Sequence, residues 1–258
     1  MKNKKLIARC IPLFASILLL MGCTVKAEKA QIKIAVAASM FEAMEDIKSV
    51  YQEENPDIDI LLQSGSSGSL RRQIEQGADI DIFISASLIH MDQLMEEGYL
   101  IDNQYETLVT NELVLITPYD SECIDSIRDL ANNSAIIFAM GEPDSVPAGT
   151  YAQEVLSYYG IDQQMPNKTV LAKDVKEVLT WVALGEADAG MVYKTNALIE
   201  KKVKIVETAD ADTHQPIVYP MARLKTAEAK KETLEFEAFM LSQEAQQIFA
   251  TYGFSEIR

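Results

Sequence analysis

The 258-residue chain has little of what enzymes most often use for chemistry. It holds only two histidines, and neither His90 nor His214 has a neighbour at the spacing of metal ligands. His90 is expected on an amphipathic helix and His214 in a polar loop, which favours solvated or locally hydrogen-bonded rings. A G-x-G-x-x-G dinucleotide fingerprint is also absent. These absences argue against an enzyme, and we expect no cofactor.

Long hydrophobic runs are missing beyond the N-terminus. A basic start over 2–9 precedes an apolar run over 11–21. This run is shorter than the roughly 20 apolar residues that span a bilayer, and the layout predicts a secretory signal over residues 1–22. It ends in Leu20-Met21-Gly22-Cys23, which resembles a bacterial lipobox. We therefore expect Cys23 to carry lipid that anchors the chain to the outer face of the cell membrane. The alternative is an ordinary signal peptide that ends near a cysteine.

Cysteine is scarce as well. Cys10 would leave with the signal and Cys23 would carry lipid, so Cys123 would be the one free thiol of the mature chain. No intramolecular disulfide is then possible. Nothing in the sequence near Cys123 indicates a catalytic role.

Positive charge is in short supply. The formal net charge of the whole chain is -16, and it becomes -20 once the four basic residues of the signal are removed. Such a surface argues against nucleic acid as a partner. An anion ligand is still compatible with this charge, because uncharged donors can contact the anion directly while distant carboxylates are screened beyond about 8 Å.

What the sequence does contain is a regular alternation of elements after a polar tether over 23–30. Apolar runs predict strands at 32–36, 58–62, 80–84, 113–116, 135–139, 189–193 and 203–206. Amphipathic stretches predict helices at 40–54, 70–76, 87–97, 151–159, 175–184, 227–241 and 243–252. This alternation predicts an α/β fold with mainly parallel sheets.

The order of elements repeats from residue 112 onward, although the sequence itself does not. We therefore expect two lobes with a ligand cleft between them. One lobe is expected to hold 31–110 together with the C-terminal segment 217–258, and the other 111–216. In open α/β sheets, ligands bind beyond the carboxyl ends of strands, where helices begin.

Four loops between a predicted strand and a predicted helix are candidates for the ligand site: 35–42, 63–70, 145–151 and 173–177. The second contains four serines and two glycines. Glycine lets the backbone approach a ligand closely, and serine adds a neutral donor. Backbone N–H groups at helix starts carry partial positive charge. The loops therefore predict an anion site that needs no lysine or arginine.

Each loop also has an ordinary structural explanation. Ser39 with Glu42, and Asp174 with Glu177, have the spacing of helix capping boxes. The serine loop could be a flexible connection. A hydrolase nucleophile elbow fails by one residue, because Ser69 stands where the second glycine of G-x-S-x-G is required.

Together the loops resemble the molybdate-binding proteins of ABC-type importers, over nearly the whole mature chain from 32 to 254. The Asp-Ile-Phe-Ile-Ser-Ala stretch is shared broadly among related solute-binding proteins, so it implies a two-lobed periplasmic-binding-protein-like fold of type II. The Pro-Ala-Gly piece and the closing tyrosine are more specific to oxyanion binders. The matching pieces are Ala37-Ala38-Ser39, Gly65-Ser66-Ser67-Gly68-Ser69-Leu70, 79–86, Val146-Pro147-Ala148-Gly149, Gly190-Met191-Val192-Tyr193 and Tyr252-Gly253-Phe254.

The resemblance implies a monomeric, extracytoplasmic binding protein that captures molybdate or tungstate and delivers it to a membrane permease. It also implies the donors, which hold the oxygens of the anion and not the metal itself. These are the hydroxyl and N–H of Ser39, the hydroxyl of Ser67, the N–H groups of Ala148 and Val175, and the phenol of Tyr193. The chain departs from some relatives at Gly68, where serine is expected, so Ser66 is an alternative to Ser67.

Another solute, such as sulfate or an amino acid, is the alternative ligand. An amino acid would usually need a charged clamp in the cleft. Arg71 and Arg72 directly follow the serine loop and could supply one. We interpret both as surface residues of the helix.

Overall fold

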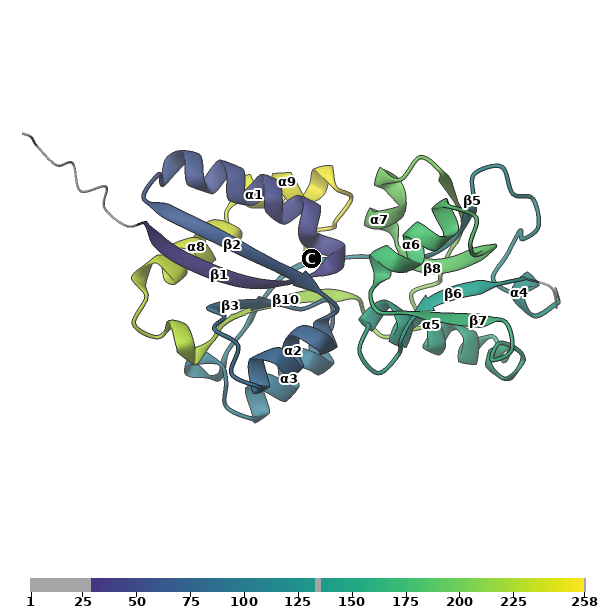
Figure 1. The fold of residues 1–258 in the computed structure, drawn as a ribbon, viewed down its shortest axis with the longest axis horizontal. Helices are drawn as coiled ribbons and strands as arrows, with labels where there is room; N and C mark the ends of the chain where they lie inside the picture. The colour runs from purple at the N-terminus through teal and green to yellow at the C-terminus, as the bar shows by residue number, and fades with distance from the viewer. Residues whose placement is uncertain (1–28, 133–135, 258) are drawn as a thin grey trace, which may run out of the picture.

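The computed structural model describes residues 29–132 and 136–257. The predicted signal and Cys23 lie outside the described residues. The described chain forms two α/β lobes side by side, each built on one five-stranded sheet (Figure 1). Within this part of the chain, no helix is long and apolar enough to cross a membrane. The prediction of a two-lobed α/β fold is confirmed.

The first sheet, which defines lobe 1 here, has the strand order β2-β1-β3-β10-β4. Its strands are β1 (Ala30–Ala37), β2 (Ile58–Gly65), β3 (Ile82–Ile84), β4 (Glu106–Thr110) and β10 (Val218–Arg223). The helices α1 (Phe41–Glu54), α2 (Ser67–Glu75) and α3 (Leu88–Glu96) follow β1, β2 and β3. β1 begins at Ala30, the last residue of the predicted tether.

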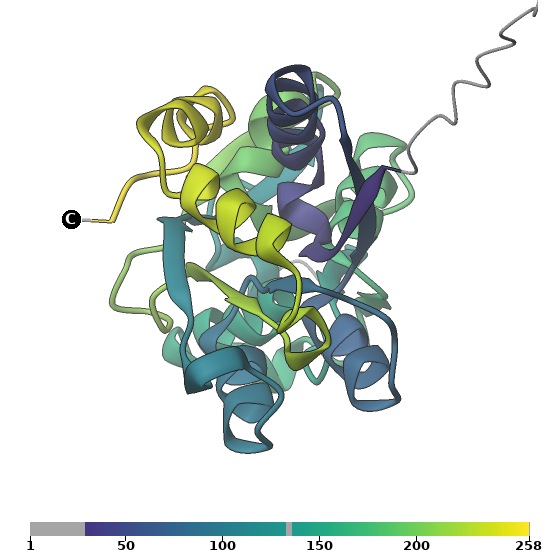
Figure 2. The same ribbon diagram turned by 90° about the vertical axis from the view of Figure 1, so that its left-hand side faces the viewer.

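The C-terminal helices α8 (Lys231–Met240) and α9 (Gln243–Thr251) return to lobe 1. They lie beside α1, as Figure 2 shows from the side of lobe 1. The ring of Tyr51 on α1 meets the ring of Phe236 on α8 edge-on, with 5.0 Å between centroids. Buried aromatic pairs of this kind anchor the C-terminal segment to the first lobe.

The second sheet, which defines lobe 2, has the order β7-β6-β8-β5-β9. Its strands are β5 (Leu113–Pro118), β6 (Phe138–Gly141), β7 (Thr169–Ala172), β8 (Ala189–Tyr193) and β9 (Val203–Thr208). Its helices are α4 (Asp129–Asn132), α5 (Pro147–Tyr158), α6 (Val175–Ala183) and α7 (Lys194–Ile199). The chain passes between the sheets twice, after β4 and after β9.

Both sheets are mixed, although the sequence predicted mainly parallel ones: in each sheet one strand, β10 or β5, runs opposite to the other four. β1, β2 and β3 pair in parallel, as do β6, β7 and β8. Every antiparallel pair involves β5 or β10. These are the first strands after the two crossings, so they start at the cleft and run away from it, opposite to strands such as β1 and β8 that end there.

Several element boundaries differ from the sequence predictions. The strand expected at 135–139 is β6, which begins at Phe138. Two helices start earlier than their apolar periodicity indicates: α2 at Ser67 and not at 70, and α5 at Pro147 and not at 151. Their first turns consist of small or polar residues, which carry no amphipathic signal. Both shifts move the helix start to the cleft.

Candidate ligand site between the lobes

A small cavity lies where the first turns of helices from both lobes meet. Its cavity volume is about 10 Å³, roughly the space of a single water and far below the roughly 300–1,000 Å³ of sites for drug-sized ligands. The structure brings all five predicted site residues, and Ser66, to its wall. The lining residues are Ala37, Ala38, Ser39, Gly65, Ser66, Ser67 and Ala86 from lobe 1, and Val146, Pro147, Ala148, Asp174, Val175 and Tyr193 from lobe 2.

Backbone N–H groups at helix starts form one part of the wall. Val175 is the first residue of α6 and Ala148 the second of α5, so neither N–H has a carbonyl partner within its helix. Gly149 and Thr150 already donate to the carbonyl of Val146, and Pro147 has no N–H. The N–H of Ala148 is therefore the one in this turn that remains for a ligand.

The close approach of α5 to β6 explains Gly149. A Cβ on this residue would lie 2.1 Å from the carbonyl oxygen of Gly141 at the end of β6. Any side chain would push the start of α5 away from the sheet and move the N–H of Ala148. The Pro-Ala-Gly piece thus has a geometric function as well as a sequence likeness.

Ser39 has a different local role from the one its sequence spacing predicts. It lies inside a 3-10 turn, Ala38–Met40, and Met40 is the N-cap of α1 without any side-chain cap bond. The capping box with Glu42 is therefore wrong: the Ser39 hydroxyl bonds the phenol of Tyr219 at 2.8 Å, and Glu42 forms an ion pair with Lys176 of lobe 2. The predicted cap of Asp174 on Glu177 is confirmed, at 3.0 Å.

The two candidate serines of the glycine-serine loop have distinct contacts. Ser67 is almost fully buried, and its hydroxyl oxygen accepts the N–H of Ala86 at 2.9 Å. Ser66 is the N-cap of α2 and accepts the N–H of Ser69 at 3.4 Å. Ser67 is therefore held by a shorter bond to a neighbouring loop, while Ser66 serves mainly to start the helix.

Tyr193 ends β8 and presents an orphaned phenol. Its side chain is 1% exposed, and its hydroxyl has no hydrogen-bond partner in the described part of the chain. Burial raises the pKa of Tyr193 well above the usual value of 10, so the group is a neutral donor at physiological pH. A buried hydroxyl without a hydrogen-bond partner costs about 1–3 kcal/mol. Its position in the cavity wall therefore points to a ligand that accepts a hydrogen bond.

Charged side chains near the site are few. No Lys, Arg or His lines the cavity among the described residues; the one ionisable carboxylate in the wall is Asp174. Arg72 is exposed, and Arg71 is partly buried by an ion pair with Glu75 one turn further along α2, so the surface interpretation holds only for Arg72. Neither arginine lines the cavity.

Of the two alternatives for His90, a solvated ring is excluded because the side chain is buried. It is 7% exposed on α3, and burial lowers its pKa to about 4. His214 is exposed and bonds the carbonyl of its neighbour Gln215. In the described residues, no three His, Cys, Asp or Glu side chains gather as metal ligands.

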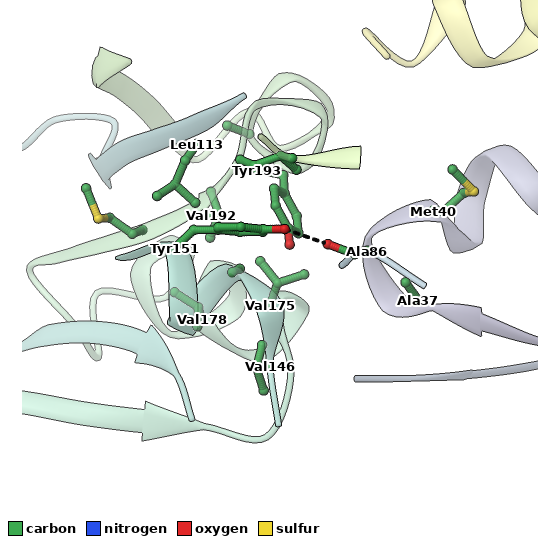
Figure 3. Close-up of a cluster of buried hydrophobic side chains, with 14 of the residues drawn as sticks. Ala37, Met40, Ala86, Leu113, Val146, Tyr151, Val175, Val178, Val192 and Tyr193 are labelled. Carbon is green, nitrogen blue, oxygen red and sulfur yellow. Dashed lines mark hydrogen bonds between the residues drawn. The ribbon is translucent and has the colours of Figure 1, made fainter. Parts of the chain in front are cut away.

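Direct contacts across the cleft show that the lobes are closed. The N–H of Gly68 donates to the carbonyl of Ser145 at 3.0 Å, and Lys176 pairs with Glu42. Tyr151 extends from lobe 2 toward Ala86 of lobe 1 and donates to its carbonyl at 3.4 Å (Figure 3).

Sequence reasoning missed Tyr151, Tyr219 and Asn111. These residues do not line the cavity but form hydrogen bonds to residues that line it or to one another. The buried hydroxyl of Tyr219 contacts Ser39, and the amide of Asn111 donates to Tyr219 at 3.2 Å. Tyr219 and Asn111 lie at the two crossings between the lobes, in an apolar strand and a polar loop. Nothing in their local sequence indicates that they meet.

Known proteins with this arrangement of lobes were found by sequence and by structure. The family model described as bacterial extracellular solute-binding protein matches residues 32–255. A Bacillus subtilis protein provisionally named the ABC transporter substrate-binding lipoprotein YvgL is 40% identical, with 95% of this chain and 96% of that protein covered. The molybdate-binding protein ModA of Haemophilus influenzae is 34% identical, with 89% and 91% covered.

A solved structure from Clostridium difficile, the substrate-binding domain of a provisionally assigned molybdenum ABC transporter, is also similar. It is 40% identical with a TM-score of 0.69, and 89% of this chain and all of that chain are covered. The matching family consists of solute-binding proteins, which are not enzymes, and its model spans most of the described chain. This chain therefore belongs to the family of bacterial extracellular solute-binding proteins.

Proposed function

We propose that this protein captures molybdate, and tungstate as its close analogue, outside the cell for an ABC importer. The observation that carries the proposal is the orphaned phenol of Tyr193 in a small closed cavity whose other donors are uncharged. The names of similar proteins support it, since ModA proteins bind molybdate. Ser39, Ser67, Ala148, Val175 and Tyr193 are the proposed ligand donors.

The donor set suits a tetrahedral dianion. The starts of α5 and α6 each contribute roughly half a unit of positive partial charge, and the hydroxyls add directed hydrogen bonds. These groups are fixed by the fold, so little reorganisation is needed when the anion enters. The strongly acidic surface does not prevent binding, because its carboxylates are screened at physiological salt.

An amino acid is disfavoured as the ligand by the cavity itself. An α-carboxylate and an α-ammonium would call for a cationic clamp and a paired anion, yet Arg71 is bound to Glu75 and Arg72 is exposed. Sulfate remains the relevant competitor because it has the same shape and charge as molybdate but is smaller. Donors spaced for the larger ion would leave part of the sulfate shell with long, weak contacts.

Competition calorimetry tests the ligand. Molybdate and tungstate are expected to bind with similar affinity at one ion per chain, and a large excess of sulfate should barely compete. Sulfate that binds as tightly as molybdate would show a general sulfate-type carrier. No binding of any of the three ions would refute the anion site altogether.

We further propose that the mature protein is a monomer held at the outer face of the cell membrane by lipid on Cys23. The lipobox-like sequence supports this, as does the lipoprotein designation of YvgL. Cys23→Ala should move the protein from the membrane to the soluble fraction without changing ligand affinity. A variant that stays with the membrane after fractionation would contradict the lipid anchor.

A further inference from the structure

A chain of hydrogen bonds runs from the hinge between the lobes to the proposed site. Asn111, which connects β4 to β5, donates from Nδ2 to Thr195 Oγ1 at 3.0 Å and to Tyr219 Oη at 3.2 Å. Tyr219 Oη lies 2.8 Å from Ser39 Oγ. Tyr219 and Ser39 are both buried. The chain therefore ends on a hydroxyl that lines the cavity.

The direction of each bond follows from the donor inventory. The side-chain oxygen Oδ1 of Asn111 accepts a hydrogen bond from the N–H of Glu112 at 2.9 Å. The side-chain NH2 group of Asn111 therefore faces Thr195 and Tyr219, with two N–H bonds to donate. Tyr219 Oη accepts a hydrogen bond from one of these N–H groups, so the remaining partner for its own single proton is Ser39. Burial raises the pKa of Tyr219 above its usual value, so this proton is present at neutral pH.

The 2.8 Å contact allows either hydroxyl to donate; with Tyr219 as the donor, Ser39 Oγ accepts the hydrogen bond and its own proton is left for the cavity. We propose that Asn111 and Tyr219 are positioning residues that hold Ser39 as a donor and thereby select for fully deprotonated oxyanions. The inference rests on the proposed function, since it deepens the role of the same site. It assigns the selectivity to residues that do not touch the ligand.

The other two hydroxyls of the site, on Ser67 and Tyr193, also have their protons available to donate to a ligand. Ser67 Oγ accepts the N–H of Ala86, so its proton also points elsewhere. The Tyr193 hydroxyl has no partner among the residues that the structure describes, so its proton is left for a ligand. Asp174 is the exception in the wall: its Oδ1 accepts the N–H of Glu177, and its Oδ2 keeps the capacity to accept a hydrogen bond. A ligand that carries a proton would thus meet a donor at each of the three hydroxyls.

Sulfate and hydrogen phosphate provide the test, because they share charge and tetrahedral shape and differ by one proton. Both are titrated as weak competitors at subsaturating molybdate, at concentrations raised until displacement is measurable, at constant ionic strength and near neutral pH, against the unmodified protein, Tyr219→Phe and Asn111→Ala. Tyr51→Phe is the matched control, since it removes a buried phenol of lobe 1 whose ring packs on Phe236, away from the cavity.

Tyr219→Phe frees a lone pair on Ser39 and lets its hydroxyl turn. We expect molybdate affinity to fall about tenfold, the loss of one directed hydrogen bond to an ion, and the affinity ratio of phosphate to sulfate to rise by about tenfold or more. Asn111→Ala should shift the ratio in the same direction, and Tyr51→Phe should leave it unchanged.

A purely structural role would weaken both competitors equally, so an unchanged ratio in folded Tyr219→Phe and Asn111→Ala overturns the inference. Phosphate that still fails to compete with Tyr219→Phe overturns it too. Failure of the proposed function looks different: molybdate would then not bind the unmodified protein, and no competition could be measured in any variant.

Discussion

At the scale of single residues, neutral donors should matter more than cations. Ser39→Ala and Tyr193→Phe are each expected to cost roughly 1.5–3 kcal/mol of molybdate binding, as for a hydrogen bond to a charged group. Arg71→Ala and Arg72→Ala should cost far less, because neither side chain lines the cavity. Calorimetry on the four variants measures the difference, and a larger loss at either arginine would favour the amino-acid alternative.

Gly68 is the residue whose identity the closed lobes explain most directly. A Cβ built there would lie 2.7 Å from Ser145 Cα and 2.8 Å from its carbonyl oxygen, on the opposite lobe. A side chain at this position would therefore meet the backbone of Ser145 when the lobes are closed. Within lobe 1 the same Cβ would lie 3.1 Å from His90 Cε1, a tight contact that does not depend on closure.

Gly68→Ala should therefore weaken ligand binding with little destabilisation of the unliganded protein. We expect at least a tenfold loss of molybdate affinity, about 1.4 kcal/mol, with only a small change in Tm in the absence of ligand, because His90 can adjust to the added methyl group. Ser69→Ala in the same turn is the control, since the Ser69 hydroxyl bonds Arg72 and the cap bond to Ser66 comes from its backbone N–H, which alanine keeps. Unchanged affinity in Gly68→Ala would show that the lobes need not approach this closely.

At the scale of elements, α1 and α6 face each other across the cleft and are linked at their first turns. Lys176 pairs with Glu42 and also lies over the ring of Phe41, 4.7 Å from its centroid. Both helices begin at the cavity, next to Ser39 and Val175. The link therefore joins the two helix starts that carry ligand donors.

Glu42→Gln and Lys176→Met should each weaken molybdate binding modestly. The two side chains are about one third exposed, so the pair is expected to contribute on the order of 0.5–1 kcal/mol, less at high salt. A double-mutant cycle of binding at low and high salt isolates this term. A coupling energy of zero at low salt would show that the pair does not stabilise the closed state.

The sequence predicted the elements well where burial is periodic and poorly where it is not. Runs such as 189–193 coincide with β8, because every residue of that strand is buried. β7 was not predicted. It is an edge strand in which the neighbouring residues Val170 and Leu171 are both exposed, so its sequence shows no alternation of buried apolar and exposed polar residues. β4 was missed as well, with only Leu108 and Val109 buried.

The candidate site was predictable as far as local sequence reaches. Loops between strands and helices are visible in the sequence, which is why the site could be placed in them; the five proposed donors were named from the family resemblance. Tyr219 could not, because its partner Ser39 is 180 residues away and only the return of β10 beside β3 brings them together. The predicted capping role of Ser39 is wrong for the same reason. Local spacing assigned its hydroxyl to a backbone N–H of α1, but the hydroxyl bonds Tyr219, which is distant in the sequence.

At the scale of the whole molecule, the two crossings let the lobes move as units. Each sheet has its own buried strands, and the polar contacts across the cleft include the Gly68–Ser145 and Tyr151–Ala86 bonds and the Lys176–Glu42 pair. A ligand that bonds both lobes can shift the balance between open and closed arrangements by its difference in affinity for the two. The anion would supply the missing partners of donors on both lobes, and so favour closure.

Ligand removal should therefore open the molecule. Small-angle X-ray scattering is expected to give a smaller radius of gyration with saturating molybdate than without it, and the change should saturate at one ion per chain. The physical reason is that Ser39 and Ser67 of lobe 1 and Tyr193 of lobe 2 can satisfy one ion together only when the cleft is closed. Gly68→Ala serves as the control, because it resists closure at the Ser145 contact and should show a smaller compaction at the same occupancy. Equal radii with and without ligand in the unmodified protein would mean that the lobes are held closed without the anion, and that binding selects no conformation.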